Sequence, residues 1–146
     1  MICDEVSVLE ANIDDMSGEW FGFLMETLMG AGALDVTLTP ATMKKSRPGV
    51  LVGVIAKPDD EERMAELLLE HSTTLGVRIT RARRVTLERH VDTVCTAYGD
   101  IRVKCAGGRA APEYEDCAQA AREHGVAVMR VYRAALAAWE DDGEER

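Results

Sequence analysis

The chain has 146 residues, of which 47% are hydrophobic and 29% are charged, and its formal net charge is −9. This length and mixture suit one globular domain with a small addition. The acidic balance argues against nucleic-acid binding and against a polybasic membrane anchor. We expect a cytoplasmic protein, because the sequence carries no signal-peptide pattern and no apolar run of membrane-spanning length.

The cysteines and histidines give no metal or disulfide signature. The four cysteines form no C-x-x-C pair and have no histidine cluster beside them, which excludes a zinc-ribbon pattern and a disulfide framework. The three histidines share no metal-ligand spacing. These residues are Cys3, Cys95, Cys105, Cys117, His71, His90 and His124.

The first part of the chain predicts a split β-α-β-β-α-β arrangement, the ferredoxin-like order. Alternating apolar residues indicate strands, and apolar stripes at helical spacing indicate helices. Pro40 interrupts the second strand pattern. In this arrangement both helices cover one face of the sheet, and the first and third strands are central. The expected elements are strand 5–15, helix 18–31, strand 33–39, strand 50–56, a helix from Asp59 through His71 and strand 77–85.

The second part predicts a hairpin and two helices. The hairpin covers about 90–97 and 101–106, and a helix runs from Pro112 to about His124, with a last helix near 128–140. We therefore expect an α+β fold in three parts. These are a ferredoxin-like domain over 1–88, a β-hairpin with a two-helix extension over 89–139 and a disordered acidic tail over 140–146.

The first strand carries the most informative polar group. Its alternation places Glu10, Asn12 and Asp14 on the open face of a central strand, with Asp15 next in the chain. Carboxylate and amide oxygens suit Mg²⁺ or Mn²⁺, especially when phosphates complete the coordination shell. The competing interpretation is a set of solvated acids or ion pairs to Arg78 or Arg84.

A basic turn and a threonine-rich loop are further candidates. Lys44, Lys45 and Arg47 on a tight turn can hold phosphate oxygens, although the segment is no Walker A motif and also fits a solvated hairpin tip. The hydroxyls of Thr73 and Thr74 could approach an anion or a sugar, but they also fit a capped helix end.

Eight ordered motifs give a family resemblance over roughly residues 5–136. The motifs are Leu-Glu-Ala-Asn-Ile-Asp-Asp-Met at 9–16, Ala-Gly-Ala-Leu-Asp-Val at 31–36, Thr-Pro at 39–40, Met-Lys-Lys-Ser-Arg-Pro-Gly at 43–49, Thr-Thr-Leu-Gly-Val-Arg at 73–78, Arg-Val-Thr-Leu-Glu-Arg at 84–89, Gly-Asp-Ile-Arg-Val-Lys at 99–104 and Pro-Glu-Tyr-Glu-Asp-Cys at 112–117. In these motifs the chain resembles the C-terminal region of the nickel-insertion proteins, the pyridinium-3,5-bisthiocarboxylic acid mononucleotide nickel chelatases.

The resemblance implies a lyase-class metal insertion. CTP, bound with Mn²⁺ or Mg²⁺, supports nickel insertion into a pyridinium bisthiocarboxylate mononucleotide and so completes the nickel-pincer cofactor of lactate racemase. No catalytic residue is assigned. The resemblance makes Glu10, Asp14 and Asp15 candidate metal ligands, and Lys44, Lys45, Arg47, Arg78, Arg102 and Lys104 candidate phosphate contacts.

The resemblance also implies partners. Complete family members carry an N-terminal region with a histidine-rich stretch, so we expect this chain to be the nucleotide-binding part and incomplete without that region. The open sheet face and the apolar last helix favour a homo-oligomer. The alternative is a non-catalytic ferredoxin-like module for ligand binding or oligomerisation. A nucleotide site requires the acidic group and the basic turn to converge, whereas a module does not.

Overall fold

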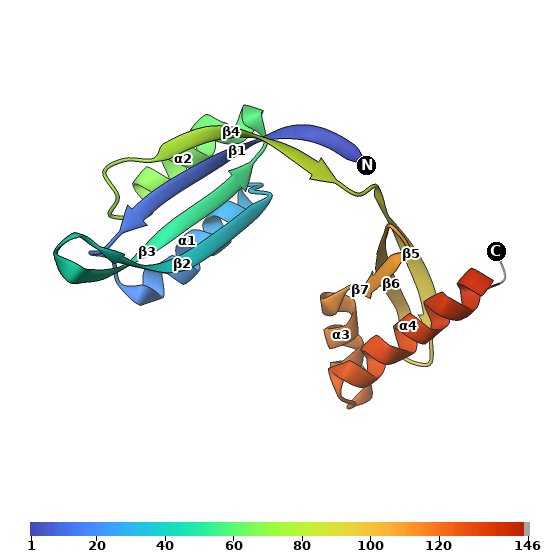
Figure 1. Ribbon diagram of the computed structural model, residues 1–146. Helices are drawn as coiled ribbons and strands as arrows, with labels where there is room; N and C mark the ends of the chain where they lie inside the picture. The colour runs from blue at the N-terminus through green and yellow to red at the C-terminus, as the bar shows by residue number, and fades with distance from the viewer. Residues whose placement is uncertain (145–146) are drawn as a thin grey trace. The chain divides into compact units, whose positions relative to one another are not determined.

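The computed structural model describes residues 1–144 and, for side chains, residues 1–141. The chain forms two compact units, one over Cys3–Val85 and one made of Met1–Ile2 and the chain from Thr86 onward (Figure 1). The boundary expected after residue 88 falls within the first residues of the second unit. No helix within residues 1–144 is long and apolar enough to cross a membrane.

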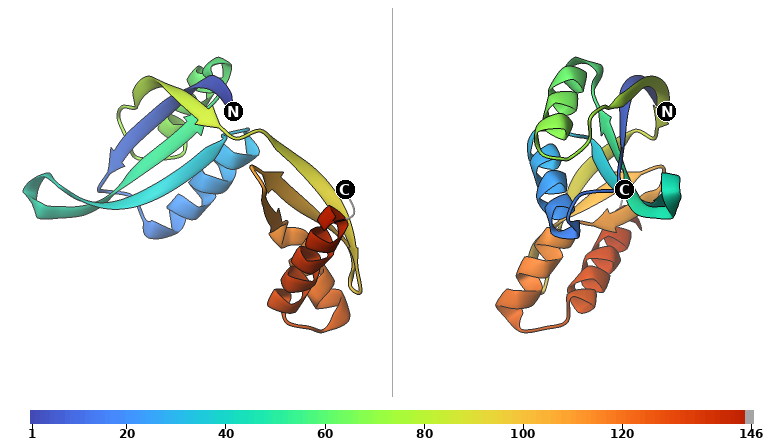
Figure 2. Two further views of the ribbon diagram at one scale, coloured as in Figure 1. Left: turned by 45° about the vertical axis from the view of Figure 1, so that its right-hand side comes forward. Right: turned by 90° about the vertical axis from the view of Figure 1, so that its left-hand side faces the viewer.

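The N-terminal unit is a four-stranded sheet in the order β2-β3-β1-β4 with two helices. This is the predicted ferredoxin-like arrangement, with the first and third strands in the centre and antiparallel to each other. Figure 2 shows both helices on one face of the sheet. The elements are β1 (Ile2–Ile13), α1 (Gly18–Gly30), β2 (Asp35–Met43), η1 (Lys44–Ser46), β3 (Arg47–Ala56), η2 (Pro58–Asp60), α2 (Glu61–Glu70) and β4 (Arg78–Thr86).

Strand β1 divides its residues between two faces as predicted. Leu9, Ala11 and Ile13 are at most 2% exposed and belong to the core beneath the helices. Glu10 and Asn12 are more exposed and lie on the other face. The alternation follows from the two-residue period of a strand, so the hydrophobic face selects which polar side chains stay open.

Pro40 does not end the second strand. The expected strand 33–39 continues to Met43, and Pro40 pairs with Val50 of β3. Strand β2 is at the edge of the sheet, where one side of each residue has no neighbouring strand. A proline, which lacks an N–H donor, is tolerated in this position.

The C-terminal unit is a three-stranded sheet in the order β5-β6-β7, packed with two helices. Strand β7 was not expected: Pro112 ends this strand opposite Val103, and the helix begins two residues later. The elements are β5 (Arg89–Thr96), β6 (Gly99–Ala106), β7 (Arg109–Pro112), α3 (Tyr114–His124) and α4 (Val128–Glu144).

The disorder predicted for the acidic tail 140–146 is wrong for residues 140–144, which continue α4. Val131 and Ala135 are fully buried, and Trp139 packs against the same core. Helix extension beyond an anchored turn needs no new nucleus, so polar residues can follow in helical conformation. Residues 145–146 lie outside the described part of the chain.

Candidate functional site

Three polar segments of the N-terminal unit meet at one end of its sheet. Strand β1 ends at Ile13 and is followed there by Asp14 and Asp15, while the β2–β3 turn supplies Arg47 and the loop after α2 supplies Thr73. An Arg47 guanidinium nitrogen lies 3.6 Å from Asp14 Oδ2. The Thr73 hydroxyl donates a hydrogen bond to Asp15. Segments far apart in the sequence therefore form one polar site.

Asp14 carries the most unusual group of this site. Its side chain is 16% exposed. Among the described residues, its Oδ2 is buried and accepts no hydrogen bond. The Arg47 nitrogen is close enough for an ion pair but too far for a normal hydrogen bond. A buried acceptor without a hydrogen bond lowers the stability of a fold by about 1–3 kcal/mol. This oxygen is therefore suited to a ligand such as a divalent ion.

A cavity of about 400 Å³ lies beside Asp14, between the start of α1 and the strands β2 and β3. Most of the residues that line it are apolar, and Asp14 is the one carboxylate among them. These residues are Ile13, Asp14, Met16, Gly18, Phe21, Leu38, Pro48, Gly49 and Val50.

The basic turn has a strained backbone. Lys45 and Ser46 have φ values of 60° and 57°, in the left-handed region that side-chain-bearing residues seldom occupy. Such residues cost of order 1–3 kcal/mol each and cluster at functional sites. The turn leaves Lys44 and Lys45 exposed, so their ammonium groups are accessible to an anion.

Gly49 lets this turn approach the end of β1. A Cβ atom at Gly49 would lie 2.6 Å from Met43 Sδ and 2.8 Å from the Ile13 carbonyl oxygen. Both distances are below normal contact, and the second involves backbone that cannot move freely. A residue without a side chain is therefore required where the basic turn passes the polar site.

The structure separates Glu10 from the other two candidate metal ligands. Glu10 lies 3.7 Å from Arg78, which is one of the ion pairs that the sequence left open. Arg84 instead pairs with Asp4, and its hydrogen bonds hold the pKa of that carboxyl below its ordinary value. Among the described residues, the carboxylates of Glu10, Asp14 and Asp15 do not form one ligand cluster. Asp14 is the member with a buried oxygen that accepts no hydrogen bond.

Two of the candidate phosphate contacts belong to the C-terminal unit. Arg102 donates to both oxygens of Asp116, at 2.7 and 2.9 Å, and Lys104 lies 2.8 Å from Glu113. Hydrogen bonds from Arg102 lower the pKa of Asp116 to about 2. A phosphate contact at either cation would have to compete with a carboxylate at the start of α3.

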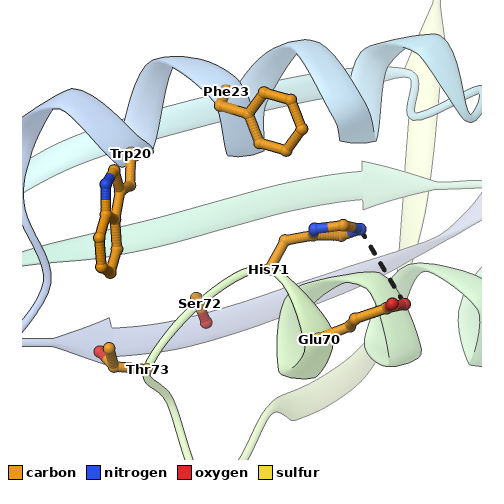
Figure 3. A pocket seen from close by; sticks show the side chains of 6 residues that line it. All are labelled: Trp20, Phe23, Glu70, His71, Ser72 and Thr73. Atoms are coloured by element: carbon orange, nitrogen blue, oxygen red, sulfur yellow. Dashed lines mark ion pairs between the residues drawn. The ribbon is translucent and has the colours of Figure 1, made fainter.

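A second hollow, which was not predicted from the sequence, adjoins Asp15 through Thr73. Trp20 and Phe23 extend from α1 and are 57% and 62% exposed. The Phe23 and His71 rings meet edge to face with centroids 5.8 Å apart (Figure 3). The signal that could have found it is the aromatic pair on the outer face of an otherwise regular amphipathic helix. The hollow measures about 340 Å³ and is lined by Trp20, Phe23, Glu70, His71, Ser72 and Thr73.

Comparison with known proteins gives consistent relatives. The family model described as nickel insertion protein matches residues 1–132. The pyridinium-3,5-bisthiocarboxylic acid mononucleotide nickel insertion protein of Lactiplantibacillus plantarum is 42% identical over an alignment of 146 positions. The alignment covers 97% of this chain and 35% of that protein. The protein of the same name from Acetivibrio thermocellus is 44% identical over 137 residues, covering 91% of this chain and 34% of that protein. The chain thus spans about a third of the length of these relatives.

A solved structure matches the whole fold. It is the C-terminal domain of a cyclometallase involved in the synthesis of the NPN cofactor of lactate racemase, in its apo form. The TM-score is 0.89 at 41% sequence identity, with 95% of this chain and 99% of that chain covered. The fold, the motifs and the matched residues agree, and the chain belongs to the nickel insertion protein family.

Proposed function

We propose that this chain is the nucleotide-binding part of a CTP-dependent nickel insertion enzyme. The reaction inserts nickel, as substrate, into a pyridinium bisthiocarboxylate mononucleotide and so completes a nickel-pincer cofactor. The observation that carries the proposal is the convergence of Asp14, whose buried oxygen accepts no hydrogen bond, and Arg47 of the basic turn. The alternative, a non-catalytic module, does not require this convergence.

The basic turn is suited to the phosphates of the nucleotide. Lys44 and Lys45 are exposed point charges, and Arg47 can offer a planar fork to phosphate oxygens. Arg78 stands near Glu10 and can add a further charge. Fixed positive groups stabilise the charge that develops on a departing pyrophosphate, so this arrangement would favour activation of the substrate by the nucleotide.

The residues present fit a divalent ion of the Mg²⁺ or Mn²⁺ type. Asp14 Oδ2 is a hard, buried oxygen without a donor, and Asp15 follows it. Three ligands from protein are not needed, because such ions commonly keep waters and use phosphate oxygens. When bound, the ion would supply charge neutralisation at the phosphates. Asp14 would hold it, and Thr73 would keep Asp15 oriented through their hydrogen bond.

The aromatic hollow next to Asp15 supports a nucleotide over a bare phosphate. Trp20 and Phe23 present exposed ring faces, and base–aromatic stacking contributes about 1–3 kcal/mol per base. We propose that the base lies in this hollow and that Thr73, which lines the hollow and contacts Asp15, separates it from the phosphate groups.

The remaining properties of the whole enzyme are also proposals. The relatives are about three times longer, so we propose that their additional region supplies soft-metal handling and that the complete reaction, of lyase class, needs it. We propose a cytoplasmic homo-oligomer. The free thiols of all four cysteines fit a reducing compartment.

Calorimetric titration of the chain with CTP and with ATP, each with and without Mn²⁺, tests the proposal. We expect Mn²⁺-dependent binding that prefers CTP and is lost in Asp14→Ala. Asp59→Ala is the matched control, because it removes an exposed carboxylate from η2. Equal binding to Asp14→Ala and wild type would contradict the site, and equal affinity for ATP would contradict the CTP specificity.

A further inference from the structure

Strands β5 and β6 bring three potential metal ligands together in the C-terminal unit. His90 pairs directly with Cys105 across the two strands, and Asp92 follows His90 on the same strand face. One ligand atom from each residue lies within 4.8 Å of the other two. Among residues 1–141, whose side chains the structure describes, this is the only group of three His, Cys, Asp or Glu residues that meets this distance.

Two of the three distances within the group match those between neighbouring ligands of one metal ion. His90 Nε2 lies 3.5 Å from Asp92 Oδ2, which is longer than a normal hydrogen bond between nitrogen and oxygen. The Cys105 thiol donates a hydrogen bond to the same oxygen, with Sγ and Oδ2 3.6 Å apart. Ligand atoms bound at about 2.0–2.3 Å around a tetrahedral ion lie about 3.3–3.7 Å apart. Both distances therefore already match those of neighbouring ligands.

The three residues of the group differ in solvent exposure. Cys105 is 3% exposed, while the side chains of Asp92 and His90 are 23% and 66% exposed. The Trp139 indole N–H of α4 donates to Asp92 Oδ2 at 3.3 Å. Hydrogen bonds of this kind orient metal ligands and affect affinity. The thiol and carboxylate are thus held by the fold, and solvent reaches the group from the histidine side.

We propose that His90, Asp92 and Cys105 bind a divalent transition-metal ion of borderline softness, such as Ni²⁺, Co²⁺ or Zn²⁺. Imidazole, thiolate and carboxylate together suit these ions, whereas Mg²⁺ and Mn²⁺ prefer oxygen alone. Three protein ligands leave a fourth position for water or for a substrate atom. The site lies in the C-terminal unit and stands independently of the nucleotide site around Asp14.

Titration of the 146-residue chain with Co²⁺, followed by competition with Ni²⁺ and Zn²⁺, tests this proposal. We expect one equivalent to bind with a thiolate-to-cobalt charge-transfer absorption. His90→Ala should weaken binding by at least about tenfold, and this residue is exposed enough for its loss to leave the fold intact. Cys105→Ser should abolish the charge-transfer absorption, with folding checked by circular dichroism.

Cys95→Ser is the matched control, because Cys95 is an exposed thiol on β5, the strand that carries His90 and Asp92. It should bind Co²⁺ as wild type does. Trp139→Phe should weaken binding by about tenfold without removing a ligand. The proposal is overturned if Co²⁺ binds without a thiolate absorption, if His90→Ala binds like wild type, or if Cys95→Ser rather than Cys105→Ser loses the signal.

Discussion

Arg47 stands 3.6 Å from Asp14 Oδ2, a buried oxygen that no described hydrogen-bond donor reaches. The two residues come from the end of β1 and the β2–β3 turn. A fold under no functional demand would gain by pairing this oxygen or replacing it. The arrangement therefore supports the proposal that Asp14 binds a ligand.

Asp14→Asn should separate stability from binding. The neutral amide loses the charge that makes the buried oxygen costly, so we expect the free energy of unfolding to stay equal or to rise by about 1 kcal/mol. Affinity for Mn²⁺ with CTP should fall at the same time. Urea unfolding measures the first effect and calorimetry the second. A strongly destabilised variant would mean that Asp14 has a structural role instead.

Gly49→Ala should destabilise the N-terminal unit by about 1–3 kcal/mol, because its Cβ would meet Met43 Sδ and the Ile13 carbonyl oxygen. Gly22→Ala in α1 is the control. Nothing lies within 4 Å of a Cβ there, so the substitution should stabilise the helix by up to about 1 kcal/mol. Thermal unfolding of both variants checks the contrast, and equal shifts would rule out the close approach at Gly49.

The Arg102–Asp116 pair should make the free energy of unfolding depend on pH in the acidic range. Hydrogen bonds from Arg102 lower the pKa of Asp116 from 3.8 to about 2 in the folded protein. The pair therefore stabilises the fold above about pH 4, by about 1–2 kcal/mol, and this contribution is lost as the pH falls toward 2. The stability difference between wild type and Asp116→Asn should shrink over that range. Glu115→Gln, in the same helical turn, should show no comparable change.

The four thiols should differ in reactivity. Burial raises the pKa of Cys105 and of Cys117, whereas Cys3 and Cys95 are exposed. Because the thiolate is the reactive form, two thiols should react quickly with a disulfide reagent at pH 8 and two slowly. The number of thiols that react in the fast phase of the native protein checks this prediction. A fast phase of three or four thiols would show that the C-terminal unit opens readily.

Trp20→Ala and Phe23→Ala should each reduce CTP affinity by about 1–3 kcal/mol if the base stacks in the hollow of Figure 3. Both side chains are mostly exposed, so unfolding temperatures should change little. Met29→Ala, an exposed position on the same helix, is the control. Unchanged affinity in both aromatic variants would place the base elsewhere.

Local patterns predicted much of the N-terminal unit, because its elements are set by short-range periodicity. The alternation of Leu9, Ala11 and Ile13 gave the buried face of β1, and the β-α-β-β-α-β order gave the sheet. The end of the second strand predicted at Pro40 was wrong, since the effect of a proline depends on whether its strand lies at an edge. That position is a property of the assembled sheet and not of the residues around the proline.

The features that were missed depend on long-range pairing. Strand β7 has four residues and ends in Pro112, so its identity rests on the neighbouring β6. The group of His90, Asp92 and Cys105 exists only in the register that sets His90 opposite Cys105. Asp14 and Arg47 were both candidate site residues, but their proximity depends on the turn between β2 and β3 reaching the end of β1. Sequence spacing alone contains none of these registers.

The most direct test of the central claim is nuclear magnetic resonance of the ¹⁵N-labelled chain with CTP and a small amount of Mn²⁺. Paramagnetic broadening reports which amides lie near the bound ion. We predict the strongest CTP-dependent broadening at Asp14 and Asp15, in the turn 43–49 and in the loop 72–78. Broadening centred on residues 90–105, or broadening that is unchanged by CTP, would contradict a nucleotide-linked divalent ion at Asp14.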